Sequence, residues 1–263
     1  MRRGLLLSPR IIKPSKKGTA MLIDLHTHTI ASGHGSTDTI SDMAKEASRR
    51  GMRLLGISDH APAILGAAKA SYFRSLQHAP RKRFQVSLLF GAEANIISYD
   101  GRLDLDQTTL SCLDYCIASL HPPCLRPGTR RQNTESYIAA MKNPLVTIIG
   151  HPDDDRYPIE DETFVTAAAR FRILLEVNES SLSPNGYRGD AAARYRALLP
   201  LCVLHRVPIL VGSDSHGRKN VGTSVYAEAL LQELHFPTDL IMNLHPELLF
   251  SYLHPAGVLA SLP

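Results

Sequence analysis

The sequence has few cysteines and no long hydrophobic run, and both absences narrow the class of protein. Four cysteines occur among 263 residues, and none has CxxC spacing. This number is too small for a disulfide framework and indicates reduced thiols. No apolar stretch approaches the length of about 18 residues that a membrane span needs, and the run at residues 4–7 is too short for a signal peptide. We therefore expect a cytoplasmic protein without a membrane partner.

Acidic residues are absent from the first 20 positions, which hold six Lys or Arg residues. The whole chain has a net charge of +4, but residues 21–263 hold 23 basic and 25 acidic residues, a balance of −2. The body of the protein therefore gives no electrostatic reason to bind nucleic acid. We expect a disordered basic tail at residues 1–20 and one domain at residues 21–263, because no linker, repeat or low-complexity tract divides the latter. Nothing in the sequence indicates the oligomeric state.

Short β-rich runs alternate with helical patterns along this body. Seven strands are predicted, at residues 21–26, 53–58, 85–92, 115–120, 146–150, 173–177 and 208–212. Helices are predicted near residues 40–50, 134–142, 160–171, 189–205 and 223–235, while residues 62–84 show no clear pattern. Nearly continuous apolar strands indicate a parallel sheet that is buried on both faces. Seven βα units predict an α/β fold with an incomplete barrel.

The first helix has the clearest signals at its ends. A stripe with helical spacing is formed by Ile40, Met43, Ala44 and Ala47. Asp38 or Thr39 can cap its N-terminus, and Gly51 suits the position just after its C-terminus.

Residues that commonly bind metal ions follow the predicted strands. His26 and His28 lie two positions apart, so both imidazoles can face one ion, although such a pair alone is weak evidence. Similar residues end or follow other apolar runs: His60, Glu93, His121, His151, Asp214 and His216. The carboxyl ends of barrel strands meet on one face, where buried ionisable groups are costly unless they are paired or bind metal. The sequence therefore predicts a metal centre.

The number of candidate ligands indicates more than one ion. His34, in the loop after His28, brings the set to nine. An ion with an open water position needs about three protein ligands, so the set predicts about three divalent ions. Imidazole with carboxylate suits Zn, Mn and Fe alike. The remaining histidines are expected to be structural: His78, His205, His235, His245 and His254.

These residues resemble the motifs of the PHP family, named for polymerase and histidinol phosphatase. The matching motifs are His26-Thr27-His28, Ser58-Asp59-His60, the pair Glu93 and His121, and Ser213-Asp214-Ser215-His216. The resemblance covers about residues 21–255, and the segments 31–34 and 93–96 look most like the stand-alone bacterial phosphatases. It implies a distorted TIM-like (β/α)7 barrel. It also implies one ion on His26, His28, Glu93 and Asp214, a second on Glu93, His121 and His151, and a third on His34, His60 and His216.

The expected activity is the hydrolysis of a small phosphomonoester. Two ions about 4 Å apart can share a hydroxide, held here at Glu93 and Asp214, that attacks the phosphorus without a protein nucleophile. Guanidinium groups suit phosphate, and Arg126, Arg156 and Arg188 lie on loops that follow predicted strands. We expect these arginines to bind the phosphate of the substrate.

Three other functions are compatible with parts of the sequence. The segment from Cys124 to Arg130 has the C-x5-R spacing of cysteine phosphatases, but prolines precede it and no helix is expected to start before Asn133 or Thr134. An amidohydrolase-like metal hydrolase would use similar ligands, but no lysine at a strand end can form its bridging carbamate. A non-catalytic metal-binding accessory module would be expected to have lost some ligands.

Overall fold

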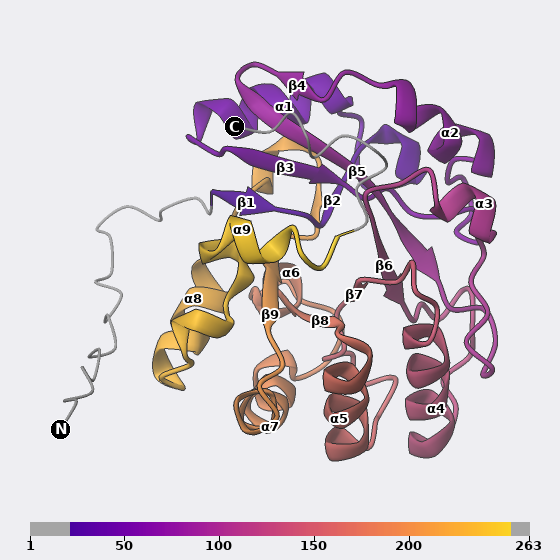
Figure 1. Cartoon of the computed structure of the whole chain (residues 1–263), viewed down its shortest axis with the longest axis vertical. Helices are drawn as coiled ribbons and strands as arrows, with labels where there is room; N and C mark the ends of the chain where they lie inside the picture. Colours follow the sequence, from indigo (N-terminus) through magenta and orange to yellow (C-terminus); the bar gives the residue numbers. More distant parts are fainter. Residues whose placement is uncertain (1–21, 254–263) are drawn as a thin grey trace, which may run out of the picture.

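The predicted barrel is present in the structure, a computed structural model that describes residues 22–253 (Figure 1). The strands are β1 (Ile23–Asp24), β2 (Thr27–His28), β3 (Leu54–Ile57), β4 (Lys82–Arg83), β5 (Val86–Asn95), β6 (Tyr115–Ser119), β7 (Ile148–Ile149), β8 (Leu174–Asn178), β9 (Ile209–Gly212) and β10 (Ser215–His216). Each of the seven predicted strands is confirmed. The first one, predicted at residues 21–26, corresponds to β1, and the short strand β2 follows it at Thr27–His28.

The strands form a nearly closed parallel barrel. Their order is β1-β3-β5-β6-β7-β8-β9, and only β4 adds an antiparallel edge, against β5. The barrel closes where β10 pairs in parallel with β2, with Thr27 opposite Ser215 and His28 opposite His216. The α/β fold class and the distorted seven-stranded barrel are therefore confirmed.

The first and last strands meet directly only at this end of the barrel. At the other end, the side chain of Asn243 lies between β1 and β9. Its amide nitrogen donates to the carbonyl oxygens of Ile23 (3.1 Å) and Val211 (2.8 Å), and its amide oxygen accepts the N–H of Val211 (2.8 Å). Asp24 in β1 adds a second link, because its Oδ1 accepts the N–H of Ser213, directly after β9, at 3.2 Å.

Helices surround the strands (Figure 1). The α-helices are α1 (Ile40–Arg49), α2 (Ala70–Ser75), α3 (Gln107–Leu110), α4 (Arg130–Met141), α5 (Asp161–Phe171), α6 (Glu179–Leu182), α7 (Ala191–Leu204), α8 (Val225–Glu233) and α9 (Pro246–Leu249). Short 3-10 helices are η1 (Ile30–Ser32), η2 (Leu76–His78), η3 (Arg218–Asn220), η4 (Thr238–Leu240) and η5 (Met242–Leu244).

The helix ends follow their capping residues. Thr39 caps α1 and forms a capping box with Asp42, and Gly51 follows with φ 78°. The expectation that no helix begins before Asn133 was wrong, because α4 starts at Arg130. Thr129 caps it and forms a capping box with Gln132, so a Thr-x-x-Gln signal was present in the sequence.

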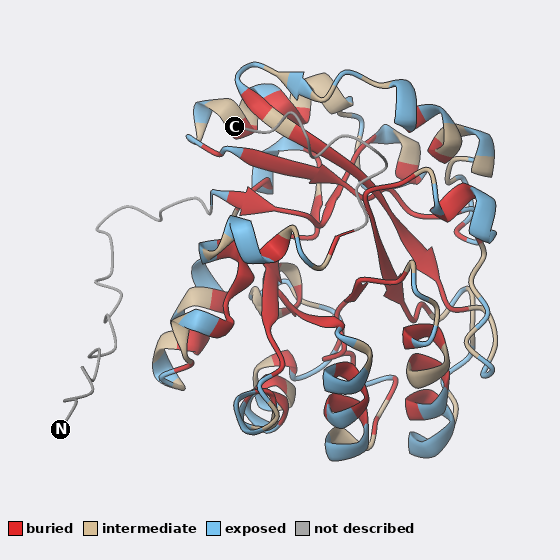
Figure 2. Cartoon of the chain, viewed as in Figure 1, coloured by how far each residue is buried: buried red, intermediate tan, exposed pale blue. Residues whose placement is uncertain are grey.

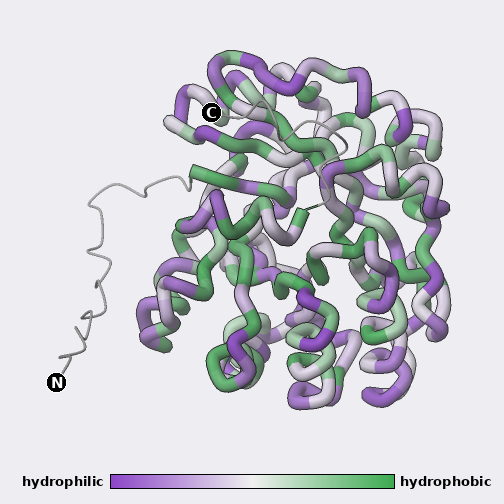
Figure 3. The backbone as a smooth tube through the Cα atoms, in the orientation of Figure 1, coloured by the Kyte–Doolittle hydropathy of each residue, from purple (hydrophilic) through white to green (hydrophobic). Residues whose placement is uncertain are grey.

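The barrel strands are mostly buried (Figure 2) and largely hydrophobic (Figure 3). Their buried side chains belong to two apolar layers. One fills the barrel below the site and includes Ile23, Leu54, Leu89, Ile117, Ile148, Leu174 and Leu210. The other lies between the strands and the surrounding helices. Burying each such side chain contributes about 1.5–3 kcal/mol, so the site rests on a rigid apolar base.

Some sequence expectations concern features other than the barrel. The four cysteines are free thiols. No helix within residues 22–253 is long and apolar enough to cross a membrane. The basic tail expected at residues 1–20 lies outside the described residues.

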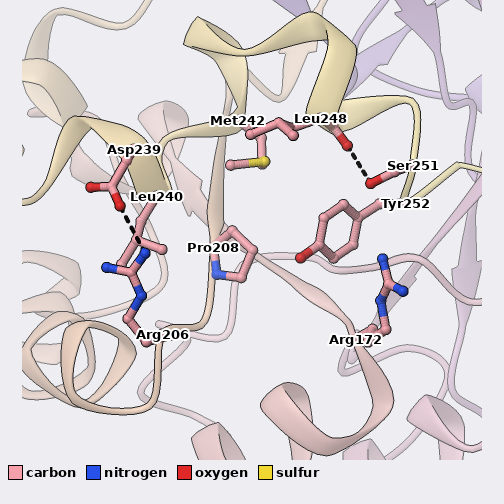
Figure 4. A pocket seen from close by; sticks show the side chains of 9 residues that line it. All are labelled: Arg172, Arg206, Pro208, Asp239, Leu240, Met242, Leu248, Ser251 and Tyr252. Carbon is pink, nitrogen blue, oxygen red and sulfur yellow. Dashed lines mark hydrogen bonds and ion pairs between the residues drawn. The ribbon is translucent and has the colours of Figure 1, made fainter.

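A pocket of about 250 Å³ lies at the amino ends of β8 and β9 (Figure 4). Arg172 and Pro208, which precede these strands, line it together with Tyr252. The guanidinium of Arg172 lies 5.3 Å from the ring centroid of Tyr252. The predicted metal ligands follow the strands instead, so this pocket is at the opposite end of the barrel.

Candidate metal centre

Eight of the nine predicted ligands gather at the carboxyl ends of the barrel strands. Seven are buried and one, His216, is partly exposed. They are His26 after β1, His28 in β2, His60 after β3, Glu93 in β5, His121 after β6, His151 after β7, and Asp214 and His216 from the end of β9 and from β10. The structure therefore brings together the residues that the strand ends predicted.

Glu93 lies at the centre of this cluster. Its Oε2 is 2.7 Å from His60 Nδ1 and 3.5 Å from His26 Nε2 and His28 Nε2. Its Oε1 is 2.8 Å from His151 Nε2 and 3.3 Å from His121 Nε2. One carboxylate thus faces five imidazoles, which is the position of a bridging ligand.

Asp214 is the second carboxylate of the cluster. Its Oδ1 lies 3.3 Å from His28 Nε2 and 3.7 Å from His26 Nε2. Both Asp214 and His151 have left-handed backbone angles, with φ of 51° and 30°. Such angles are uncommon for residues other than glycine and are concentrated at functional sites.

Several buried polar atoms of the cluster have no hydrogen-bond partner among the described residues. They include His26 Nε2, His28 Nε2, Glu93 Oε2, His121 Nε2 and Asp214 Oδ1. Buried polar atoms normally have partners, so a converging set of orphaned ligand atoms fits a metal centre. Three groups have ligand atoms within 4.8 Å of one another: His26, His28 and Asp214; His60, Glu93 and His121; and His28, His60 and His216. This mixed donor set suits divalent metal ions.

Neighbouring polar groups orient three of the imidazoles. The Nδ1 atom lies 2.6 Å from Glu176 Oε1 in His26, 2.9 Å from Ser32 Oγ in His28, and 2.7 Å from Asn95 Oδ1 in His121. In each ring the contact at Nδ1 leaves Nε2 facing the cluster. Contacts of this kind fix the ring and its tautomer in metal sites.

The electrostatics favour the protonation states that ligands need. Burial lowers the pKa of His28, His121 and His216, and for His28 the neighbouring His60 and His216 lower it further. Burial would raise the pKa of Glu93, but His60, His121 and His26 hold it well below its usual range. Neutral imidazoles and ionised carboxylates are the forms that bind metal.

In the protein without metal, the pKa of His26 is shifted in the opposite direction to the pKa of these imidazoles. Burial alone would lower its pKa, but Glu176, Glu93 and Asp214 raise it well above the usual value. A bound cation would have to displace the proton of His26, so metal binding and proton release are coupled here.

His34 lies in the loop after η1 and is exposed. Its ring centroid is 4.9 Å from that of His60 and 5.1 Å from that of His216. Burial and the nearby His60 and His216 lower its pKa. The loop therefore brings His34 next to the two histidines with which it was grouped, although strand alternation could not place it there.

The three predicted phosphate-binding arginines have different surroundings. Arg126 is exposed, and Arg156 is paired with Asp154 at 2.6 Å. Arg188 is only 3% exposed, and its guanidinium donates to Asp214 Oδ2 (2.9 Å). Of the three, only Arg188 directly contacts a candidate ligand.

The ring of Tyr187 connects two of these arginines at the rim of the site. Its centroid lies 5.4 Å from the guanidinium carbon of Arg156 and 4.8 Å from that of Arg188. Tyr187 is 65% exposed. Arg156 is therefore at the edge of the site, outside the cluster itself.

Two buried carboxylates of the site were given no role in the sequence analysis, although Asp59 stands in one of its motifs. Glu176 lies in β8 and Asp59 follows β3. Asp59 accepts hydrogen bonds from Thr29, Ser32 and Tyr72, and so fixes the loop that carries His34. A charged residue inside an otherwise apolar predicted strand was the available signal for Glu176.

The structure also bears on the C-x5-R segment. Burial raises the pKa of the Cys124 thiol to about 12. A cysteine nucleophile needs the thiolate, which this environment disfavours near neutral pH. Because α4 starts at Arg130, the lack of a helix after this segment no longer argues against a cysteine phosphatase. The raised pKa of the Cys124 thiol argues against it instead.

Comparison with known proteins shows the family of this chain. The PHP domain matches residues 24–179, more than half of the chain. The chain belongs to the PHP domain family. A "Probable phosphatase" of Clostridium botulinum (strain Langeland) is 40% identical over 241 residues, which cover 92% of this chain and 98% of that protein. Another, of Acetivibrio thermocellus, is 38% identical and covers 88% of this chain and 95% of its own length.

A solved structure has the same barrel. Histidinol phosphate phosphatase from Lactococcus lactis, in complex with zinc, L-histidinol and phosphate, aligns with a TM-score of 0.54 and covers 81% of this chain and 94% of that one. The sequences are 17% identical, so this likeness bears on the fold. In this PHP protein, Asp214 and His216 lie beyond the matched residues, and the closure of β2 with β10 brings them to the site.

Proposed function

We propose that this protein is a metal-dependent phosphatase that hydrolyses small phosphomonoesters with water as the nucleophile. The observation that carries the proposal is the convergence of orphaned buried ligand atoms on Glu93 and Asp214. PHP relatives named as probable phosphatases, which match nearly the whole chain, support the reaction class. The phosphate in the Lactococcus lactis structure supports a small phosphorylated substrate.

The nine candidate ligands would hold about three ions, as zinc, manganese or iron. We assign His26, His28, Glu93 and Asp214 to the first ion, Glu93, His121 and His151 to the second, and His34, His60 and His216 to the third. The contacts of Glu93 with both His26 and His151 support a bridging role. When bound, such ions supply Lewis acidity, which activates water and neutralises phosphate charge near neutral pH.

The protein's own groups then have distinct tasks. Glu93 and Asp214 concentrate negative charge where cations bind, and their ionised state needs no further proton loss. Arg188 holds Asp214 through its Oδ2, which leaves Oδ1 directed to the histidines. Arg156, at the rim, can bind an incoming phosphate only if it loosens its pair with Asp154. We therefore expect Arg126 and Arg156 to affect substrate affinity more than turnover.

The test is a panel of phosphomonoesters, including p-nitrophenyl phosphate and histidinol phosphate, assayed on purified protein before and after chelation. We expect chelation to abolish turnover and added Zn, Mn or Fe to restore it. Glu93→Gln should lower turnover on the order of 100-fold or more, because the bridging carboxylate is lost. His78→Ala, which changes an exposed histidine of η2, is the control. Full turnover in protein shown to be free of metal would refute the proposal.

A further inference from the structure

β8 is the barrel strand without a predicted metal ligand, yet it places a carboxylate directly beneath the cluster. Glu176 is 1% exposed and lies one position before the end of the apolar run Leu174–Val177. Leaving a charged group in such a position is costly unless it is paired. The contacts of Glu176 indicate what it does there.

Each oxygen of Glu176 contacts a different candidate ligand. Oε1 is 2.6 Å from His26 Nδ1, and Oε2 accepts the backbone N–H of His151 at 2.7 Å. Oε2 also accepts from Asn178 Nδ2 at 3.1 Å. Oε1 is thus held by His26, and Oε2 by His151 and Asn178.

The contact with His26 selects a tautomer. A carboxylate at Nδ1 requires a proton on Nδ1, so Nε2, which faces Glu93 and Asp214, is the nitrogen that would give up its proton to bind an ion. The contact with His151 acts on the backbone instead. His151 has φ 30°, a conformation that persists only where its surroundings hold it, and its N–H is fixed by Oε2.

The space around Glu176 allows little adjustment. A Cβ atom at Gly212 in β9 would lie 2.2 Å from Glu176 Oε1 and 2.9 Å from His26 Cβ. Glycine at this position is therefore what lets the carboxylate and the imidazole approach each other. β9 thus packs closely against both the Glu176 carboxylate and the His26 imidazole.

We infer that Glu176 is a positioning residue that sets the geometry of two metal sites at once, through the tautomer of His26 and the backbone of His151. This inference rests on the proposed function for the assignment of these histidines to two ions. The carboxylate contacts two candidate ligands and Asn178, so its loss is expected to act through metal binding rather than through the substrate.

Glu176→Gln is the informative substitution because it keeps the size of the side chain. The amide of glutamine has one oxygen that accepts and one NH2 group that donates, so it cannot accept from both His26 Nδ1 and the His151 N–H. If its NH2 faces His26, Nδ1 must accept and Nε2 carries the proton. If its NH2 faces His151, it opposes the N–H of His151 and the amide of Asn178. Either orientation disturbs one of the two sites.

The matched control is Glu179→Gln. Glu179 is another buried carboxylate, three residues further on, and it accepts the N–H groups of Tyr226 and Ala227 at the start of α8. It contacts no candidate ligand. A general effect of removing a buried charge from this segment would therefore appear in both variants, whereas an effect on metal binding would appear in one.

The experiment is chelator competition with zinc, together with native mass spectrometry of the full-length protein. We expect Glu176→Gln to bind its ions about 10–100-fold more weakly than wild type, and Glu179→Gln to match wild type. Equal zinc affinity in folded Glu176→Gln and wild type overturns the inference. If Glu176→Gln does not fold, Glu176→Asp is used instead. Aspartate keeps both carboxylate oxygens, but its side chain is one methylene shorter and cannot make both contacts. Weaker zinc binding by Glu176→Asp supports the inference, and wild-type zinc affinity overturns it.

The measurements distinguish a failure of the proposed function from a failure of this inference. Wild-type protein that binds zinc tightly but hydrolyses no phosphomonoester would refute the phosphatase and leave the role of Glu176 testable by affinity. Wild-type protein with full turnover, beside a Glu176→Gln variant of unchanged zinc affinity, would retain the phosphatase and remove the role of Glu176.

Discussion

Replacing His34 by alanine tests how many ions the site holds. His34 was assigned to the third ion by resemblance, and its ring lies next to those of His60 and His216 at 4.9 and 5.1 Å. The side chain is exposed, so its removal should change the free energy of unfolding by no more than about 0.5 kcal/mol. His26, His28, Glu93, His121, His151 and Asp214 remain for the other two ions.

The expected result is therefore a loss of function without a loss of fold. His34→Ala should hold about one ion fewer than wild type, and turnover should fall about 10–100-fold, which corresponds to about 1.4–2.7 kcal/mol. Metal content is measured by native mass spectrometry, turnover with p-nitrophenyl phosphate, and stability by urea denaturation. His78→Ala is the control, because it removes another exposed histidine away from the cluster.

Unchanged metal content and turnover in His34→Ala would refute this reasoning. The site would then be binuclear, and His34 would be a solvent-facing loop residue. A variant that loses turnover but keeps all its ions would instead place His34 in contact with the substrate.

Two further predictions concern other parts of the chain. Cys124→Ser should keep wild-type turnover, and iodoacetamide should not inhibit the wild type, because burial raises the pKa of this thiol to about 12; inactivation that a chelator does not reproduce would revive the cysteine phosphatase. Deleting residues 1–20, which lie outside the described residues, should leave the turnover and melting temperature nearly unchanged; failure of the shortened chain to fold would show that the tail belongs to the domain.

The barrel could be predicted because its strands are apolar on both faces and end in recognisable ligands. A short run of apolar residues identifies such a strand directly, as for residues 173–177. Capping residues identify a helix end, as Thr39 does for α1. The start of α4 was missed although its capping box was present, because Arg130 and its neighbours have no apolar stripe.

The groups that orient the ligands could not be predicted in the same way. Glu176 and Asp59 act through contacts with residues far away in the sequence, and no local spacing connects Glu176 with His26 or His151. The contact of Arg188 with Asp214 likewise depends on how the loop before α7 folds back, which no local pattern indicates. Long-range pairing of this kind appears only once the barrel is closed.

The seam of the barrel gives the metal centre a role in holding the chain together. β2 and β10 pair through only two residues each, and one of these pairs is His28 with His216. Both belong to one group of possible ligands, together with His60. In the proposed assignment the first ion joins His28 to Asp214 and the third joins His34 to His216, so each would cross-link the first strands to the last ones, as a disulfide would. Metal loss would then open the barrel at this seam first, while the contacts of Asn243 with Ile23 and Val211 and of Asp24 with Ser213 would remain.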